Sequence, residues 1–242
     1  MKKFLNLLMA AAGLGILAGS PARAEDGVGK EILEALRLVE DPEGSANVRS
    51  GPSLQSKVSG QLAAGTVVAI EPGPAKDWTQ LWAAMEGDKA RYVHSSRLQP
   101  VLKWKQVAGR EAPGGEAAAV KADGLEVNVK ALPFVAARHK ITKDSQGMEL
   151  VDGQSPWGMD GGLPRQSLRL TVSLNGRRLA LPEAATANLY QPNLESLVLL
   201  TPARASDQSF VIMTNGDGGG AYCVVWAFRK GVYLGREVFV PF

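Results

Sequence analysis

The chain of 242 residues is long enough for one large domain or two small ones. It contains 27 basic residues, 24 acidic residues and a single cysteine, Cys223. The first 24 residues hold three of the basic residues and no acidic one, so the remainder of the chain is formally neutral. This balance argues against nucleic acid as a partner. The lone cysteine excludes a disulfide bond within the chain.

The first 24 residues have the pattern of a secretory signal sequence. Lys2 and Lys3 precede an apolar run over residues 4–17, and a small-x-small motif follows at residues 22–24. A retained membrane anchor is the weaker alternative, because the run is shorter than the roughly 20 residues that a helix needs to cross a bilayer. We therefore predict a signal helix cleaved after Ala24, a periplasmic or secreted location, and no stable membrane insertion of the processed chain.

Residues 25–103 predict a lead-in followed by a small β-domain. Residues 25–35 have a weak helical period, which fits a short helix or an irregular segment. Over residues 36–103, short strand-like segments alternate with turns such as Asp41-Pro42-Glu43-Gly44. Short strands separated by turns predict a small barrel.

Four segments within residues 36–101 resemble a known family. They are DPEGSANVRSGPS, KVSGQLAAGT, DW and YVHSSRL, in this order. Together they look like a bacterial SH3-like domain. The resemblance implies a module that contacts peptidoglycan or another envelope component, or that mediates contacts within larger envelope proteins. Trp82 and Tyr92 are then candidate ligand-binding residues, because an aromatic ring offers a broad apolar face and a polar edge. We expect Trp78 in the core.

The second half of the chain predicts a separate β-domain. Residues 104–124 are rich in alanine, glycine and charged residues and show no sustained period, which predicts a linker between domains that move semi-independently. Residues 125–242 contain six strand-length apolar segments divided by turn residues, and only residues 183–189 favour a helical turn. The expected fold is therefore all-β, with an SH3-like barrel over residues 36–103 and an antiparallel β-sandwich over residues 125–242.

Two loops of the second domain are candidate functional loops. The segment VDGQSPWGMDGGLP, residues 151–164, places Trp157 and Asp160 among glycines and prolines. It is similar to a Trp-Gly-Asp-Gly loop in uncharacterised secreted bacterial proteins, a similarity that implies no activity. The segment NGDGGG, residues 215–220, offers Asn215 and Asp217 as calcium ligands beside Asp160. A simple hairpin is the favoured alternative, because Asp-Gly between two strands is a common hairpin signal.

No pattern in the sequence indicates catalysis. Cys223 lies in AYCVVWAFRK, where apolar residues on both faces predict a buried and unactivated thiol. His94 and His139 have no metal-ligand partner at a suitable spacing. The acidic residues Glu126, Glu149, Asp152 and Asp160 show no spacing that favours a glycosidase. We therefore expect no catalytic residue, metal or cofactor.

These observations lead to one favoured function and two alternatives. The favoured function is an exported, non-enzymatic envelope protein whose SH3-like module contacts peptidoglycan or another envelope component and whose second domain binds an unknown partner. Its candidate ligand-binding residues are Trp82, Tyr92, Trp157 and Asp160. The first alternative is an interaction scaffold or an inhibitor of a secreted protein. The weaker second alternative is a cell-wall hydrolase that uses Cys223 or Asp160.

Overall fold

The computed structural model describes residues 28–71, 76–82, 89–159, 161–202, 207–215 and 218–240. The predicted signal sequence, Asp160 and Asp217 lie outside the described residues. Within the described ranges, no helix has both the length and the apolar character that a membrane crossing requires.

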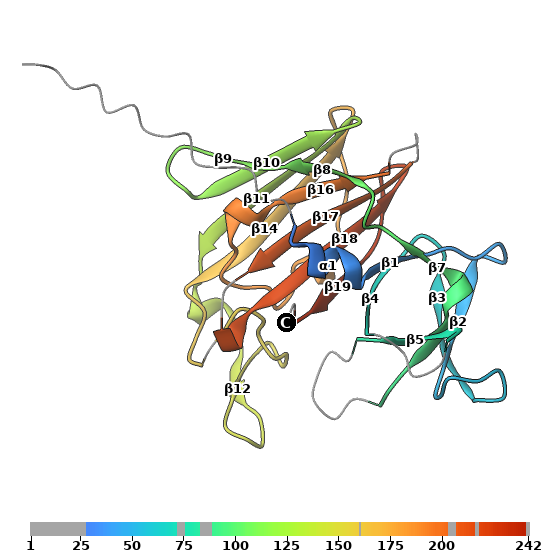
Figure 1. Cartoon of the computed structure of the whole chain (residues 1–242). Helices are drawn as coiled ribbons and strands as arrows, with labels where there is room; N and C mark the ends of the chain where they lie inside the picture. Colours follow the sequence, from blue (N-terminus) through green and yellow to red (C-terminus); the bar gives the residue numbers. More distant parts are fainter. Residues whose placement is uncertain are drawn as a thin grey trace, which may run out of the picture.

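Antiparallel β-structure dominates the described residues, which confirms the all-β prediction (Figure 1). The α-helix of these ranges is the short α1, Lys30–Ala35, where the weak helical period predicted a helix or a lead-in. Single 3₁₀ turns connect some of the strands: η1 (Ser95–Arg97), η2 (Ala136–Arg138), η3 (Glu183–Ala185), η4 (Leu194–Ser196) and η5 (Gly218–Gly220). The turn η3 accounts for the first part of the helical turn predicted over residues 183–189.

The N-terminal sheet contains seven strands in the order β3-β2-β6-β5-β4-β1-β7. These strands are β1 (Leu36–Val39), β2 (Ser45–Arg49), β3 (Val58–Ala63), β4 (Val67–Glu71), β5 (Trp78–Leu81), β6 (Tyr92–His94) and β7 (Leu98–Pro100). Val48, Val68 and Val93 are buried in its own small core, and Trp78 is also buried, as predicted. After β2, the Arg49 guanidinium donates to the carbonyls of Leu54 and Ser56, both at 2.8 Å, and so holds the turn that follows.

Two five-stranded sheets and a hairpin contain the other strands of the described residues. The central sheet has the order β19-β18-β17-β16-β8, and the distal sheet has the order β15-β14-β11-β10-β9. The central strands are β8 (Lys105–Ala108), β16 (Val198–Thr201), β17 (Gln208–Asn215), β18 (Tyr222–Arg229) and β19 (Val232–Phe239). The distal strands are β9 (Arg110–Glu111), β10 (Ala117–Ala122), β11 (Leu125–Pro133), β14 (Gln166–Leu174) and β15 (Arg177–Arg178). A separate hairpin pairs β12 (Ile141–Lys143) with β13 (Glu149–Val151).

Burial along the strands explains how the two sheets pack. In β11, alternate residues such as Val127 and Val129 are buried, so one face of the distal sheet is apolar. In β18, every residue except Arg229 is buried, so the central sheet is covered on both faces. The two sheets share a hydrophobic core that includes Val127, Trp226 and Phe228, and they pack face to face as a sandwich.

The predicted linker over residues 104–124 is wrong, because this segment forms strands of both sheets. β8 pairs with β16 in the central sheet, while β9 and β10 belong to the distal sheet. Gly109 joins β8 to β9 where the chain passes from one sheet to the other. Its amide donates to the Leu197 carbonyl at 2.6 Å, and a Cβ at Gly109 would lie 2.8 Å from that oxygen. The glycine at position 109 therefore permits close packing, although the alanine and glycine content of this segment predicted flexibility.

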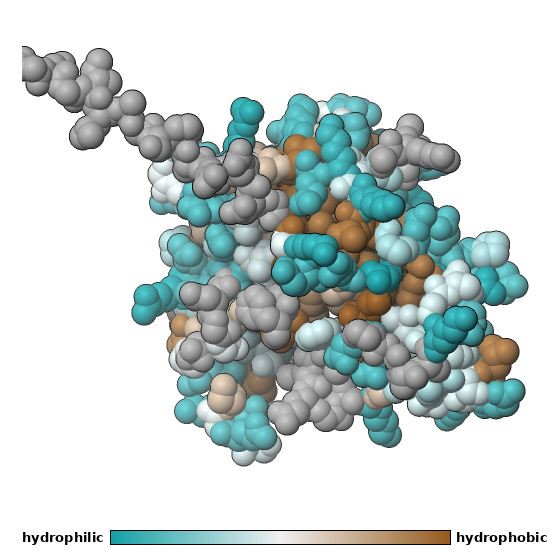
Figure 2. All heavy atoms as spheres, in the orientation of Figure 1, coloured by the Kyte–Doolittle hydropathy of each residue, from teal (hydrophilic) through white to brown (hydrophobic). Residues whose placement is uncertain are grey.

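The expectation of loosely connected domains is also wrong. α1 and the N-terminal sheet pack against the free face of the central sheet, and the two sides share one apolar core. Its members from the N-terminal side include Ile32, Leu36 and Val101, and those from the central sheet include Phe210 and Phe239. Figure 2 shows apolar residues gathered over the central sheet beside α1. Apart from Trp104, the residues that make this interface lie outside the predicted linker.

Candidate binding clefts

The aromatic residues predicted to bind a ligand do not form one platform. Trp82 is half-buried at the interface with the central sheet, where its ring centroid lies 6.1 Å from that of Phe239. Trp157 lies 6.1 Å from Tyr222, which faces the distal sheet. Trp82 and Trp157 therefore pack on opposite faces of the central sheet. Tyr92 is half-buried in β6, on the N-terminal sheet.

Trp157 lines a cleft between the two glycine-rich loops, which we call the loop cleft. Its volume is about 590 Å³. Met148, Trp157, Met159, Asn188, Gly220 and Val240 are among its lining residues. A Cβ at Gly220 would lie 2.8 Å from the backbone of Met159, so the two loops touch only because residue 220 is a glycine. The described parts of the two predicted functional loops therefore lie side by side.

Backbone hydrogen bonds fix Trp157 in the loop cleft. Its amide donates to the Asn188 carbonyl at 2.8 Å, and its carbonyl accepts from the Tyr190 amide at 3.1 Å. The Asn188 side-chain amide donates to the Ser155 carbonyl at 3.0 Å. The backbone at Trp157 is therefore held in place before any ligand arrives, which lowers the entropic cost of binding.

Arg236 supports this arrangement from inside the sandwich. Its guanidinium donates to the Ala187 carbonyl and to Asn188 Oδ1, both at 2.8 Å. Burial lowers the pKa of Arg236, while Tyr233 and Tyr222 favour its charged form. The Tyr222 hydroxyl donates to the Tyr190 carbonyl at 2.9 Å. Arg236 was not predicted as a site residue, because an arginine in a terminal strand normally faces solvent.

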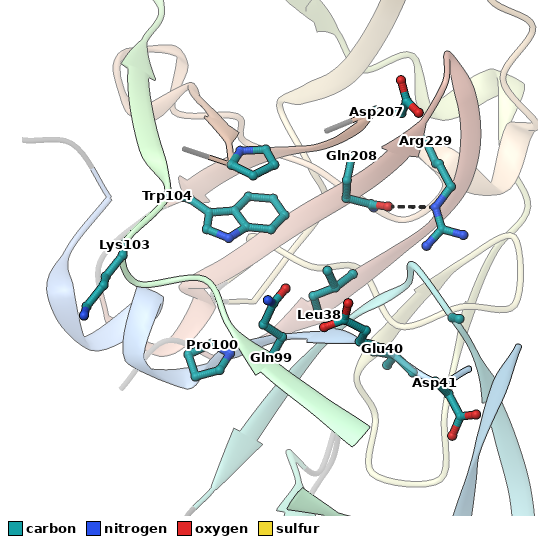
Figure 3. A pocket seen from close by; sticks show the side chains of 13 residues that line it. Leu38, Glu40, Asp41, Gln99, Pro100, Lys103, Trp104, Asp207, Gln208 and Arg229 are labelled. Atoms are coloured by element: carbon teal, nitrogen blue, oxygen red, sulfur yellow. Dashed lines mark hydrogen bonds between the residues drawn. The ribbon is translucent and has the colours of Figure 1, made fainter. Parts of the chain in front are cut away.

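A second cleft lies where the N-terminal sheet meets the central sheet, and we call it the junction cleft (Figure 3). Its volume is about 620 Å³. Its walls come from segments far apart in sequence. The first half of the chain contributes Leu38, Glu40, Asp41, Gln99, Pro100, Lys103 and Trp104, and the second half contributes Asp207, Gln208 and Arg229. In Figure 3, Trp104, Gln208 and Arg229 border one side, while Gln99 and Glu40 border the other.

Trp104 forms a rigid apolar wall of the junction cleft. Its ring stacks on Phe210 with a centroid separation of 4.9 Å and an interplanar angle of 8°. Phe210 is fully buried and Trp104 is half-buried, so the indole is held by the core while part of it lines the cleft. Trp104 was not among the predicted site residues, because it begins the segment assigned as a linker. An aromatic residue inside such a segment was the available signal.

A chain of polar contacts holds the two sides of the junction cleft together. The buried Gln208 side chain donates from Nε2 to the Gly65 carbonyl at 2.7 Å and accepts from Arg229 Nε at 3.1 Å. Gly65 has a φ of 93°, and a Cβ there would lie 2.3 Å from Arg229 Nη2. A glycine is thus required both by the backbone conformation and by the adjacent guanidinium.

Among the groups considered for catalysis, Cys223 is a core residue, and His94 and His139 have hydrogen-bonding partners. Cys223 is fully buried, and burial raises the pKa of its thiol to about 12, so the thiol stays protonated near neutral pH. His94 Nδ1 lies 2.8 Å from Ser96 Oγ and accepts from the Ser96 amide at the start of η1. His139 pairs with Asp152 at 2.7 Å, and this hydrogen bond lowers the pKa of Asp152.

Metal ligation and calcium binding have no support among the described residues. In these ranges no group of three or more histidine, cysteine, aspartate or glutamate side chains could hold a metal ion. Asn215 Oδ1 accepts from the Asn193 amide at 2.7 Å, and so serves the loop before η4. The calcium hypothesis for residues 160 and 217 concerns positions that the structure does not describe.

Comparisons with known proteins found no relative of this chain. No protein-family model matches the chain, and neither a curated protein nor a solved structure is significantly similar to it.

Proposed function

We propose that this protein is an exported, non-enzymatic binding protein of the bacterial envelope. In this proposal the SH3-like module over residues 36–103 contacts peptidoglycan or another envelope component, and the sandwich binds a second partner. The observation that carries the binding function is the loop cleft, in which two glycine-rich loops meet around a fixed Trp157. A preformed, largely apolar cleft with a few convergent polar groups is the usual form of a binding site.

Capture from an envelope extract tests the role of the loop cleft. Trp157→Ala should reduce capture of the partner by about tenfold or more, because a central aromatic residue commonly dominates a binding surface. Met148→Ala is a milder variant, since this methionine is exposed at the rim of the cleft. Val232→Ala, at a similarly exposed apolar residue outside both the cleft lining and the SH3-like module, is the matched control. Equal capture by the wild type and both cleft variants would reject this site.

A pull-down on purified peptidoglycan tests the other half of the proposal. The processed chain should be retained above an unrelated β-domain of similar size. Absence of retention would reject peptidoglycan as the envelope component.

The second candidate is an inhibitor or scaffold of a secreted protein. It is favoured by the apolar residues Trp157, Met159 and Val240 in the loop cleft, since apolar and aromatic side chains are enriched in the centres of protein interfaces. A proteinaceous partner that remains bound after glycosidase treatment of the extract would support it. Loss of capture after that treatment would favour a glycan-containing partner instead.

A further inference from the structure

We propose that the junction cleft is a saccharide-binding site, which accepts a short oligosaccharide of low net charge. This site lies apart from the loop cleft and does not depend on the function proposed above. Its four recognition residues are Trp104, Gln99, Glu40 and Arg229.

Trp104 provides the stacking surface that a sugar ring requires. Pyranose rings have an apolar face of C–H groups, which packs favourably on the face of an indole. The parallel stack on Phe210, at 4.9 Å, prevents the indole from rotating away. A ring that is already oriented loses little entropy when the ligand binds.

Planar polar side chains surround this stacking surface. Carboxylate, amide and guanidinium groups each present two hydrogen-bonding atoms in one plane, a geometry that matches neighbouring hydroxyls of a sugar. Glu40 and Gln99 are exposed on the N-terminal side of the cleft. On the opposite side, Arg229 is oriented by its hydrogen bond to Gln208 (Figure 3).

Charge balance favours a saccharide over a strongly charged ligand. Lys103 and Arg229 bring positive charge to the cleft, and three carboxylates bring negative charge. Two of these carboxylates already have partners: Asp41 pairs with Arg97 at 3.2 Å, and Asp207 pairs with Lys230 at 3.4 Å. The remaining groups, Lys103, Arg229 and Glu40, leave one net positive charge, which is too little to select a polyanion and excludes a polycation. The volume of about 620 Å³ suits a small ligand.

The site exists only when the N-terminal sheet is packed on the central sheet. Gln99 and Glu40 belong to the N-terminal side, whereas Gln208 and Arg229 belong to β17 and β18. A ligand that touches both sides therefore stabilises their packing by mass action.

Titration of the ¹⁵N-labelled processed chain with defined sugars tests the inference. The probes are chitotetraose, maltotetraose and the disaccharide of N-acetylglucosamine and N-acetylmuramic acid, and the readout is the five tryptophan indole N–H signals. We expect a saturable shift of the Trp104 signal, assigned with Trp104→Phe, for at least one probe. A response to the two amino-sugar probes alone would indicate wall glycan, and a response to maltotetraose would indicate a different glycan. No saturable shift with any probe would overturn the inference.

Variants at exposed residues separate binding from folding. Gln99→Ala and Glu40→Gln should each weaken the binding by about three- to tenfold, the value of one lost hydrogen bond. The matched controls are Gln146→Ala and Glu195→Gln, which change exposed residues outside the cleft. Equal affinities in the cleft variants and the controls would also overturn the inference. Because soluble sugars are used, failure on intact peptidoglycan would reject peptidoglycan as the envelope component of the proposed function and leave this result intact.

Discussion

The two faces of the central sheet are both buried, but they are built differently. The face toward the distal sheet carries Tyr222, Trp226 and Phe228, and its polar atoms bond to nearby loops: Trp226 Nε1 donates to the Ala185 carbonyl at 2.7 Å. The face toward the N-terminal sheet carries smaller side chains in β18, namely Cys223, Val225 and Ala227. One of its polar contacts lies at the margin, where Gln208 bonds to Gly65.

This difference shows how one strand supports two clefts. The face toward the distal sheet anchors the loop cleft through bulky residues and the bonded segment 185–190. The opposite face packs against apolar residues from the N-terminal side of the chain, and the junction cleft lies at the edge of this contact. The loop cleft should therefore persist as long as the sandwich is folded, whereas the junction cleft should persist only while the N-terminal sheet is packed on the central sheet.

Truncation of the largest residue on each face should have the strongest effect. Trp226→Ala and Phe210→Ala should each lower the free energy of unfolding by about 3–5 kcal/mol, because each leaves a cavity in a fully buried core. Urea unfolding measures this loss. In the folded fraction, Phe210→Ala should release Trp104 and disturb the junction cleft, while Trp226→Ala should disturb the loop cleft. The same pattern of indole shifts in both variants would contradict the comparison.

The contact between Gly65 and Arg229 tests the margin of the N-terminal interface. Gly65→Ala should cost about 2–3 kcal/mol, because the new methyl group combines an unfavourable φ with a clash against the guanidinium. Gly44→Ala is a matched control, since Gly44 has a similar φ of 88° and nothing within 4 Å of the added atom. This control should cost only about 1 kcal/mol.

Alkylation of Cys223 gives a second readout for the same variants. The thiol is buried beneath the N-terminal side, so it should react only when that side opens. Gly65→Ala should speed the reaction, whereas Gly44→Ala should leave it near the wild-type rate. Equal rates in the two variants would show that the margin does not hold the interface closed.

Glu237 should make the N-terminal interface sensitive to pH. Burial raises the pKa of this β19 carboxyl to about 7, although a hydrogen bond with the Ala69 backbone and the charge of Arg91 lower it. Since the folded pKa exceeds the unfolded one, the stabilisation is complete below about pH 4.5 and is lost as the pH rises through about 7. At about pH 8, Glu237→Gln should therefore gain about 1–2 kcal/mol, a value reduced for a side chain that still meets solvent.

Unfolding at several pH values provides the check for Glu237. The wild type should lose stability between about pH 5 and pH 8, and Glu237→Gln should flatten that change. The face toward the distal sheet supplies a control, because Tyr222→Phe removes a group whose raised pKa lies far above this range. A slope that is unchanged in Glu237→Gln would show that another group titrates.

The smallest effect is expected at the surface pair beside the junction cleft. Lys230 and Asp207 lie 3.4 Å apart and both are exposed. Asp207→Asn should change the free energy of unfolding by about 0.5 kcal/mol or less, because solvent and salt screen such pairs. Thermal unfolding at low and high salt measures it. A larger loss would show that Asp207 helps to hold β17 against the N-terminal side.

Local patterns in the sequence were sufficient to predict most of the strands and to single out the loop that contributes Trp157 to one of the clefts. The alternation in residues 125–133 and the apolar run in residues 222–228 predicted strands, because burial of one or both faces of a sheet leaves a periodic trace. Trp157 was recognisable as a candidate because a tryptophan is unusual in a loop dense with glycine. The buried state of Cys223 was predicted for the same reason as its strand.

Tertiary structure alone decided the role of residues 104–124 and the existence of the junction cleft. Alanine and glycine occur both in flexible linkers and in closely packed strands, and only the neighbouring Leu197 shows which case applies to Gly109. Trp104, Gln208 and Gly65 have no special spacing in the chain, since three separate segments bring them together. By itself the sequence determined which segments bury apolar faces. Which faces meet depends on long-range packing, and that is why the interface and its cleft were visible only in the folded chain.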